Sequence, residues 1–249
     1  MNQTHHAGHS EEHPDTHGAP GGLAISASDY TLDIESKTLE AGQDETLGFR
    51  ILDQAGHPVR DFDEQHGERM HLIVVRRDLI YYHHLHPSLD IDGTWSVPLT
   101  LPEPGVYRAF ADFSVGGEPL TLGTDLFVPG DMTFAPLPSP MNTAEVEGYT
   151  VTLEVGTTNA RTQSSLTFRV TQEGRKVLGL EPYLGALGHL VALREGDLAF
   201  LHVHPTGGTD SQITFHATFP SIGRYRLFLQ FAHAGRVHTA AFTIDIAPP

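Results

Sequence analysis

Two segments of the chain carry histidines at the same three positions. Residues 71–87 read HLIVVRRDLIYYHHLHP, and residues 189–205 read HLVALREGDLAFLHVHP. Imidazole nitrogens are good ligands for zinc and copper(II), and three of them around one point form a typical divalent-metal site. The sequence therefore predicts one three-histidine site per segment. The predicted ligands are His71, His84 and His86 in the first and His189, His202 and His204 in the second.

Each segment is predicted to form a β-hairpin. A two-residue turn at Arg77-Asp78, or at Glu195-Gly196 in the second segment, would place the first histidine of each trio opposite the second. The third histidine lies two residues further along the strand and therefore on the same face. That face also carries apolar residues, so we expect each trio on the core side of its sheet, at the end away from the turn.

Five residues elsewhere are candidates for additional ligands. Asp112 and Gln230 occupy matching positions on strands expected to neighbour the first histidine of each trio. Side chains alternate between the two faces of a strand, and counting from the tyrosine at the matching position of each repeat points Asp112 and Gln230 away from the core. We therefore expect them to support the ligands rather than bind the metal. The full candidate set is His66, Glu68, Asp112, His233 and Gln230.

The similarity of the two segments extends outward along the chain on both sides. LGFRILDQAGHPV pairs with LTFRVTQEGRKV, and LPEPGVYRAFADF pairs with FPSIGRYRLFLQF. This indicates a tandem duplication. We expect two domains, residues 25–129 and 146–249, joined by a Pro-rich linker over residues 130–145.

Both repeats are predicted to be all-β. Short runs of Val, Ile, Phe, Tyr and Thr alternate with Gly, Pro and Asp turns, giving about seven strands per repeat. The Gly-x-Tyr patterns at Tyr107 and Tyr225 are typical of the tyrosine corner that opens the penultimate strand of an immunoglobulin-like sandwich. The predicted fold is two tandem immunoglobulin-like β-sandwiches.

Residues 1–24 are predicted to be a disordered tail. They contain few core-forming residues and five histidines, at positions 5, 6, 9, 13 and 17. Such a tail can chelate metals loosely.

Charge and composition exclude several functions. The net charge of −16 argues against nucleic-acid binding, and the lack of cysteine excludes disulfides and thiolate sites. No apolar run is long enough for a transmembrane helix, and no signal peptide follows Met1. On this basis we expect either a cytoplasmic protein or a sequence from which the export signal has been left out.

The HLHP and HVHP segments, in the contexts HLIVVRRDL and YLGALGHLVALREGDLAF, resemble bacterial extracytoplasmic proteins with YtkA-like or copper-resistance-type immunoglobulin folds. The resemblance covers nearly all of residues 25–247. It implies an extracytoplasmic location and an association with copper or other heavy metals.

The expected function is binding of copper or zinc as divalent ions, for buffering, delivery or resistance, with another metal-handling protein as a possible partner. One alternative is a metal-dependent enzyme, because His-x-His also occurs in cupins; the leading histidines lie upstream, unlike the cupin order. Another is a binding module whose histidines are structural. The sequence favours a role other than catalysis, because it shows no Ser-His-Asp set, phosphate loop or paired catalytic carboxylates, and we assign no catalytic residue.

Overall fold

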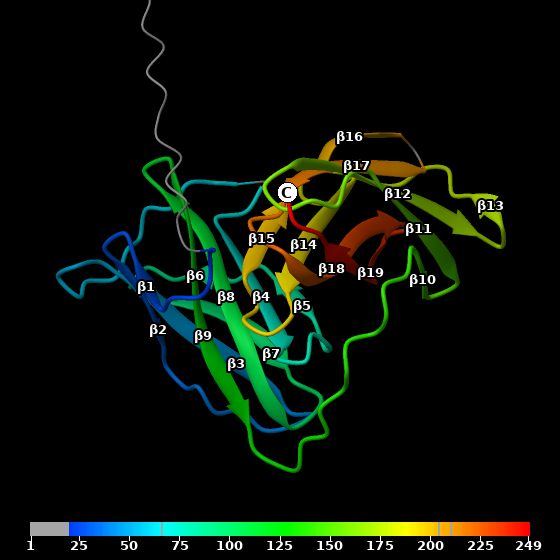
Figure 1. The fold of residues 1–249 in the computed structure, drawn as a ribbon. Helices are drawn as coiled ribbons and strands as arrows, with labels where there is room; N and C mark the ends of the chain where they lie inside the picture. The colour runs from blue at the N-terminus through cyan, green and yellow to red at the C-terminus, as the bar shows by residue number, and fades with distance from the viewer. Residues whose placement is uncertain (1–19, 66, 204, 210) are drawn as a thin grey trace, which may run out of the picture.

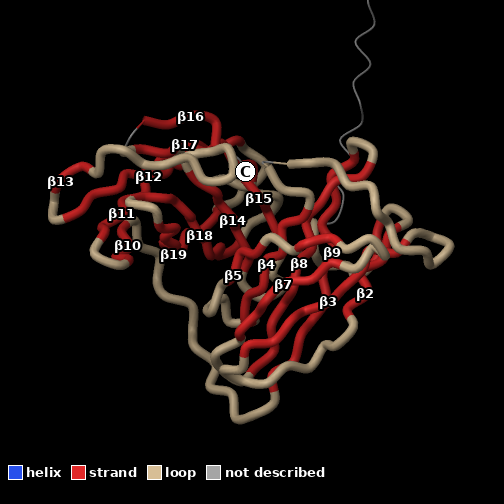
Figure 2. The backbone as a smooth tube through the Cα atoms, turned by 180° about the vertical axis from the view of Figure 1, so that it is seen from behind, coloured by secondary structure: helices blue, strands red, loops and turns tan. Residues whose placement is uncertain are grey.

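The computed structural model describes residues 20–65, 67–203, 205–209 and 211–249. These residues form β-strands and loops with no α-helix, arranged as two tandem β-sandwiches (Figures 1 and 2). The prediction of an all-β tandem repeat is confirmed. The described part of the chain has no helix with the length and apolarity needed to cross a bilayer. The expectations for residues 1–19, His66 and His204 lie outside the described residues.

Domain 1 consists of two antiparallel sheets. One has the spatial order β1 (Ser26–Ala27), β2 (Tyr30–Ile34), β3 (Asp44–Leu52), β7 (Trp95–Thr100) and β6 (Ser88–Leu89). The other has the order β5 (His83–Leu85), β4 (Met70–Arg76), β8 (Gly105–Val115) and β9 (Glu118–Val128).

Domain 2 repeats this arrangement. Its first sheet has the order β10 (Thr143–Val146), β11 (Tyr149–Val155), β12 (Gln163–Gln172), β17 (Gln212–Thr218) and β16 (Pro205–Thr209), with β13 (Arg175–Lys176) also pairing with β12. Its second sheet has the order β15 (Phe200–Val203), β14 (Gly188–Arg194), β18 (Gly223–His233) and β19 (Arg236–Ile246).

Both predicted tyrosine corners are present. The Tyr107 hydroxyl donates to the Glu103 carbonyl oxygen at 2.8 Å, and the Tyr225 hydroxyl donates to the Ser221 carbonyl oxygen at 3.1 Å. Both tyrosines are fully buried and lie near the start of the penultimate strand of their domain. A hydrogen bond from this tyrosine to the backbone a few residues upstream is a hallmark of immunoglobulin-like sandwiches.

Each domain has its own apolar core, and a third core lies between the domains. Strand β4 contributes to two of them, because successive side chains point to opposite faces of a strand. Leu72 and Val74 pack inside domain 1, whereas Ile73 and Val75 pack against domain 2. The interdomain core contains Ile73, Val75, Leu79, Phe110, Val191, Leu193, Leu198, Phe200 and Phe228.

Aromatic stacking across the domains is reciprocal. Phe110 of domain 1 stacks on Phe200 of domain 2, with ring centroids 5.0 Å apart. Tyr82 and Phe228, which occupy the matching positions in the opposite domains, stack at 4.1 Å with an interplanar angle of 8°. The same pair of positions therefore stacks twice, with the roles of the two domains exchanged. The two β-sheets that carry the histidines face each other.

The hairpin register differs from the prediction by two residues. His84 lies opposite Ile73 and His202 lies opposite Val191, so neither faces the first histidine of its trio. The turn is longer than two residues because Leu79 and Leu198 adopt left-handed φ values of 63° and 60°. A shift of two residues keeps every side chain on the predicted face, so the histidines of each trio still share one face.

The position of the trios on the core side of their own sheets is also wrong. His71 and His84 share the face of Ile73 on strands β4 and β5, and that face points away from the core of domain 1. The same holds for His189 and His202 on β14 and β15. His71, His84 and His189 are nevertheless buried and His202 is half-buried, because the opposite domain covers this face.

Candidate metal centre

The described histidines of both trios lie together at the interface between the domains. The ligand nitrogens of His71, His84 and His86 all lie within 4.8 Å of one another. The His202 ring of domain 2 is centred 5.4 Å from His71 and 6.0 Å from His84, and the His189 ring is centred 6.0 Å from His84. We call these five side chains the histidine cluster.

The first histidine of each trio is held by a backbone carbonyl at the same position. His71 Nε2 donates to the Gln65 carbonyl oxygen at 3.1 Å, and His189 Nε2 donates to the Tyr183 carbonyl oxygen at 2.8 Å. Both carbonyls lie six residues before their histidine. A carbonyl oxygen only accepts, so Nε2 carries the hydrogen and, in a neutral ring, Nδ1 is left as a lone pair.

The second histidine of each trio is held by the opposite domain. His84 Nδ1 donates to Gln230 Oε1 at 2.7 Å, and His202 Nδ1 donates to Asp112 Oδ2 at 2.7 Å. In this orientation of the amide, Gln230 Nε2 donates to Thr239 Oγ1 at 3.4 Å. Neutral His84 and His202 therefore carry their lone pair on Nε2.

These hydrogen bonds bring two lone pairs together. His71 Nδ1 and His84 Nε2 are 3.0 Å apart, and in neutral rings neither carries a hydrogen. A proton between them would require one ring to be charged. Burial first, and then repulsion from neighbouring histidines, lowers the pKa of His71 to about 3 and the pKa of His84 well below its usual range. Near neutral pH the pair is therefore two facing acceptors.

The third histidine of the first trio completes this arrangement. His86 Nε2 is buried and has no hydrogen-bond partner among the described residues. Burial, followed by repulsion from His189 and His202, lowers the pKa of His86 to about 4. A neutral buried nitrogen without a partner is costly in a folded protein, and a bound cation would satisfy it.

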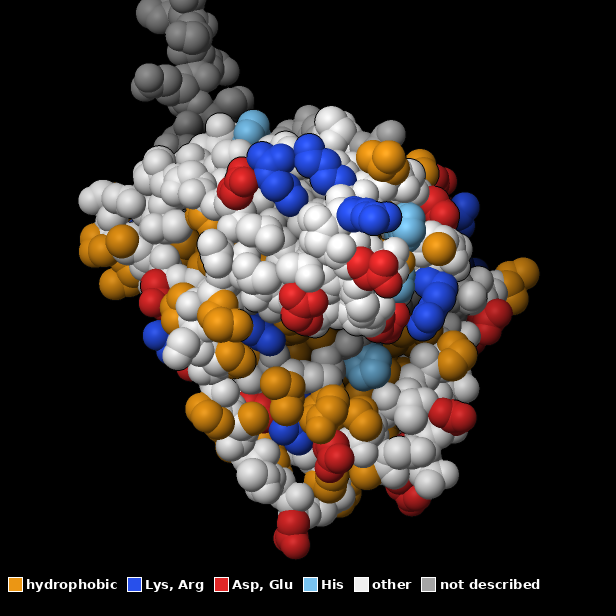
Figure 3. Space-filling view, turned by 90° about the vertical axis from the view of Figure 1, so that its right-hand side faces the viewer, with side chains coloured by type: hydrophobic (Ala, Val, Ile, Leu, Met, Phe, Trp, Pro, Cys, Tyr) orange, Lys and Arg blue, Asp and Glu red, His pale blue; other side chains and the backbone are white. Residues whose placement is uncertain are grey.

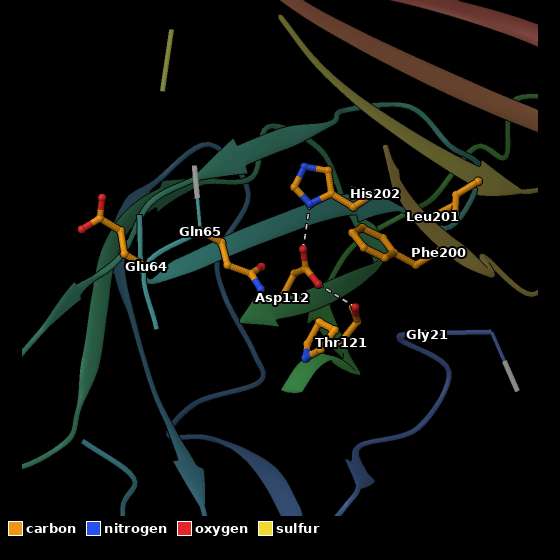
Figure 4. A pocket seen from close by; sticks show the side chains of 9 residues that line it. Gly21, Glu64, Gln65, Asp112, Thr121, Phe200, Leu201 and His202 are labelled. Atoms are coloured by element: carbon orange, nitrogen blue, oxygen red, sulfur yellow. Dashed lines mark hydrogen bonds and ion pairs between the residues drawn. The ribbon is translucent and has the colours of Figure 1, made fainter. Parts of the chain in front are cut away.

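The carboxylate of Asp112 remains ionised beside the cluster. Burial alone would raise its pKa, but hydrogen bonds from His202 and from Thr121 Oγ1, the latter at 2.6 Å, lower it below the usual value. Figure 4 shows Asp112 between these two partners. A carboxylate that orients a histidine in this way is a common support for a metal ligand.

The other predicted ligands have different positions. Asp112 and Gln230 pair with His71 and His189 on the adjacent strands, as predicted, and each orients a histidine of the opposite domain. Glu68 contributes after burial to a raised pKa of Tyr183, whose ring contacts His86 and His189. His233 lies apart from the cluster, where its Nδ1 bonds the Tyr149 hydroxyl at 2.8 Å.

Sequence reasoning missed the two carbonyls of Gln65 and Tyr183. Their side chains differ, so no residue pattern marks them. The only signal is their equal spacing of six residues before His71 and His189. This spacing indicates a hydrogen bond only if a backbone carbonyl oxygen, rather than a side chain, is considered as the acceptor for the first histidine of each trio.

The solved structures to which the chain is similar include a bacterial adhesin. The chain is 15% identical to the Escherichia coli adhesin FdeC (TM-score 0.31), covering 90% of this chain and 66% of that one. It is 17% identical to Yersinia pseudotuberculosis InvD (TM-score 0.30), covering 90% and 59%. A two-domain fibronectin type III segment of chicken tenascin is 12% identical (TM-score 0.26), covering 92% and 99%.

These TM-scores are too low to support an argument about function, and the chain spans less than two thirds of the length of FdeC and InvD. A comparison with curated proteins found no match. The matching family model does not show the resemblance to YtkA-like or copper-resistance-type families, which stays a prediction. It matches twice, at residues 25–129 and 144–248, and its description is "Domain of unknown function (DUF8832)". The chain belongs to the DUF8832 family and contains two tandem copies of its domain.

Proposed function

We propose that the protein binds a divalent copper or zinc ion in the histidine cluster between its two domains, and that it serves in metal buffering, delivery or resistance. The observation that carries this proposal is the contact between His71 Nδ1 and His84 Nε2. With both rings neutral and the Gln230 amide oriented as described, two lone pairs face each other at 3.0 Å in the metal-free protein. In a tetrahedral site with Zn–N bonds of 2.0–2.1 Å, neighbouring ligand nitrogens are about 3.3 Å apart, so a small expansion would admit an ion.

The surrounding charges support a cation. The Asp112 carboxylate, kept ionised by its hydrogen bonds, contacts His202 and lies on the strand next to His71. Neutral imidazoles together with one carboxylate favour copper(II) or zinc over calcium or magnesium, which prefer oxygen ligands. Two further parts of this proposal are an extracytoplasmic location, which the resemblance to YtkA-like or copper-resistance-type proteins implies, and a metal-handling partner.

A second candidate is a binding module in which the histidines only join the domains. The reciprocal bonds of His84 with Gln230 and of His202 with Asp112 favour it, because they connect the domains without a metal. The two candidates differ in whether purified protein retains a stoichiometric ion.

The test uses full-length protein in which the five histidines of residues 1–19 are replaced by glutamine, which we call the tail-Gln variant. Equilibrium dialysis against copper(II) or zinc should show tight binding at the cluster, and adding His84→Gln and His86→Gln should abolish it. His57→Gln is the matched control, because its side chain is 79% exposed. Absence of tight binding in the tail-Gln variant would refute the metal proposal and favour the binding module.

A further inference from the structure

A pocket of about 660 Å³ opens beside the histidine cluster. Its walls come from both domains: Glu64 and Asp112 from domain 1, and Phe200 and His202 from domain 2. Figure 4 shows the His202 ring and the Asp112 carboxylate at this pocket, with Gly21 on the opposite side. Figure 3 shows that one face of the molecule is also hollowed, with a histidine side chain at the edge of the hollow.

The pocket wall and the histidine cluster share residues. His202 belongs to both, and its ring is centred 5.4 Å from the ring of His71. Gln65 lines the pocket, and its carbonyl oxygen accepts the hydrogen bond from His71 Nε2. His71 itself is 1% exposed, so its nitrogens have no direct contact with bulk solvent. The pocket therefore brings solvent within one side chain of the cluster.

The rim of the pocket is held by hydrogen bonds to both domains. The Gly22 amide donates to the Thr121 carbonyl oxygen at 2.9 Å, and the Phe200 amide donates to the Gly21 carbonyl oxygen at 3.3 Å. Arg108 Nη2 donates to the Gly22 carbonyl oxygen at 2.7 Å. This segment is therefore fixed across the domain interface, although the sequence predicts disorder up to residue 24. The opening beside the cluster is thus built into the fold.

The charge and size of the pocket suit a hydrated divalent cation. The buried Asp112 carboxylate stays ionised, and Glu64, an exposed residue of the wall, adds a second carboxylate. No lysine or arginine is among the described residues that line the pocket. Carboxylates in a cleft concentrate cations and repel anions. A divalent ion with six water ligands occupies about 180 Å³, at about 30 Å³ per water, so it fits with its hydration shell.

We infer that this pocket is the entry port through which hydrated copper(II) or zinc ions reach the histidine cluster. The inference rests on the proposed function. The ion enters with its water ligands, is attracted by Asp112, and exchanges water for nitrogen at His202 and then at the facing nitrogens of His71 and His84. Because release follows the same path in reverse, narrowing the port slows loading and release by the same factor and leaves the dissociation constant unchanged.

The first experiment narrows the port in the tail-Gln variant. Pro119 lines the pocket and is exposed on β9, where a tryptophan suits a strand. Pro119→Trp should slow zinc loading and EDTA-driven zinc release by at least about tenfold each, measured by stopped flow with a fluorescent zinc indicator. The matched control is Ile91→Trp, because Ile91 is 95% exposed and does not line the pocket.

The second experiment reverses a charge of the port. Glu64→Lys in the tail-Gln variant should slow zinc loading by about three- to tenfold at about 0.01 M ionic strength. The difference should largely disappear at about 1 M, because salt screens charges in contact with solvent. Asp92→Lys is the control with the same change in net charge, since its side chain is 58% exposed on a loop.

The possible outcomes separate the two proposals. If Pro119→Trp and Glu64→Lys both load zinc as fast as their controls, the ion enters elsewhere and the port is refuted, while the retained zinc leaves the metal site intact. If Pro119→Trp also weakens equilibrium binding, Glu64→Lys alone decides, and an unchanged rate at low salt refutes the port. Failure of the tail-Gln variant itself to retain zinc would refute the metal site and, with it, the port.

Discussion

Asp112→Asn tests whether a carboxylate from one domain supports a metal ligand of the other. Asp112 is 9% exposed, accepts a hydrogen bond from His202 Nδ1 at 2.7 Å and accepts another from Thr121. An asparagine oxygen can still accept from His202, so the ring keeps its orientation. The lost contribution is the negative charge, which neutralises part of the charge of a bound cation.

The expected effect is on metal affinity rather than on folding. Removing a charged partner of a ligating histidine typically weakens metal binding by about 10–100-fold, which corresponds to about 1.4–2.8 kcal/mol of binding free energy. The metal-free melting temperature should change little, because the substitution also removes a buried charge. Binding should be measured by calorimetric titration of the tail-Gln variant with zinc or copper(II).

The control is Asp92→Asn, which removes an exposed charge from a loop. Its side chain is 58% exposed, so its effect on affinity reports only the change in net charge. If Asp112→Asn binds the ion as tightly as Asp92→Asn does, the carboxylate does not support a metal ligand and the reasoning from His202 is wrong.

Three further predictions concern the interface and the folds. Because burial lowers the pKa of His71 to about 3 and of His86 to about 4, the unfolded chain binds more protons than the folded one between those values and about 6.5. The metal-free free energy of unfolding should be constant above pH 6.5 and fall as the pH drops toward 4, and a flat denaturation profile over this range would contradict the burial of neutral rings. Phe200→Ala removes the stack on Phe110 and should destabilise the protein by about 3–5 kcal/mol, with weaker metal binding and a larger radius of gyration in solution scattering; an unchanged radius with unchanged affinity would show that the interdomain core does not position the cluster. Tyr225→Phe should cost about 1 kcal/mol in chemical denaturation by removing the hydrogen bond to Ser221, and no loss would mean that this bond is replaced by water.

Much of the fold follows from local patterns. The alternation of β-forming and turn residues, the Gly-x-Tyr motifs and the internal repeat predict the tandem sandwich, and the structure confirms it. Parity also correctly places the histidines of a trio on one face, because a two-residue register error leaves the face unchanged. The turn length escaped prediction because Leu79 and Leu198 adopt a conformation that leucine rarely takes.

The interdomain location was harder to predict. Residues 72–75 are apolar at every position, so either face of β4 can be read as the core face. Such a continuous apolar run is typical of a strand covered on both sides. The run therefore indicates that something packs on the outer face of β4, but it does not identify the other domain as the covering element. The hydrogen-bond partners of His84 and His202 lie 146 and 90 residues away, in the opposite domain. No local sequence pattern predicts such contacts.

The reciprocal contacts between the domains have the geometry of an isologous dimer, in which one patch meets a second copy of itself. Identical subunits in such a dimer must carry the same residue at both equivalent positions. Here one polypeptide forms both halves, so Asp112 and Gln230 can differ although they occupy equivalent positions. One half of the interface presents a charged acceptor and the other a neutral amide. Covalent fusion thus releases the interface from symmetry, and the two sides of the histidine cluster can be tuned independently.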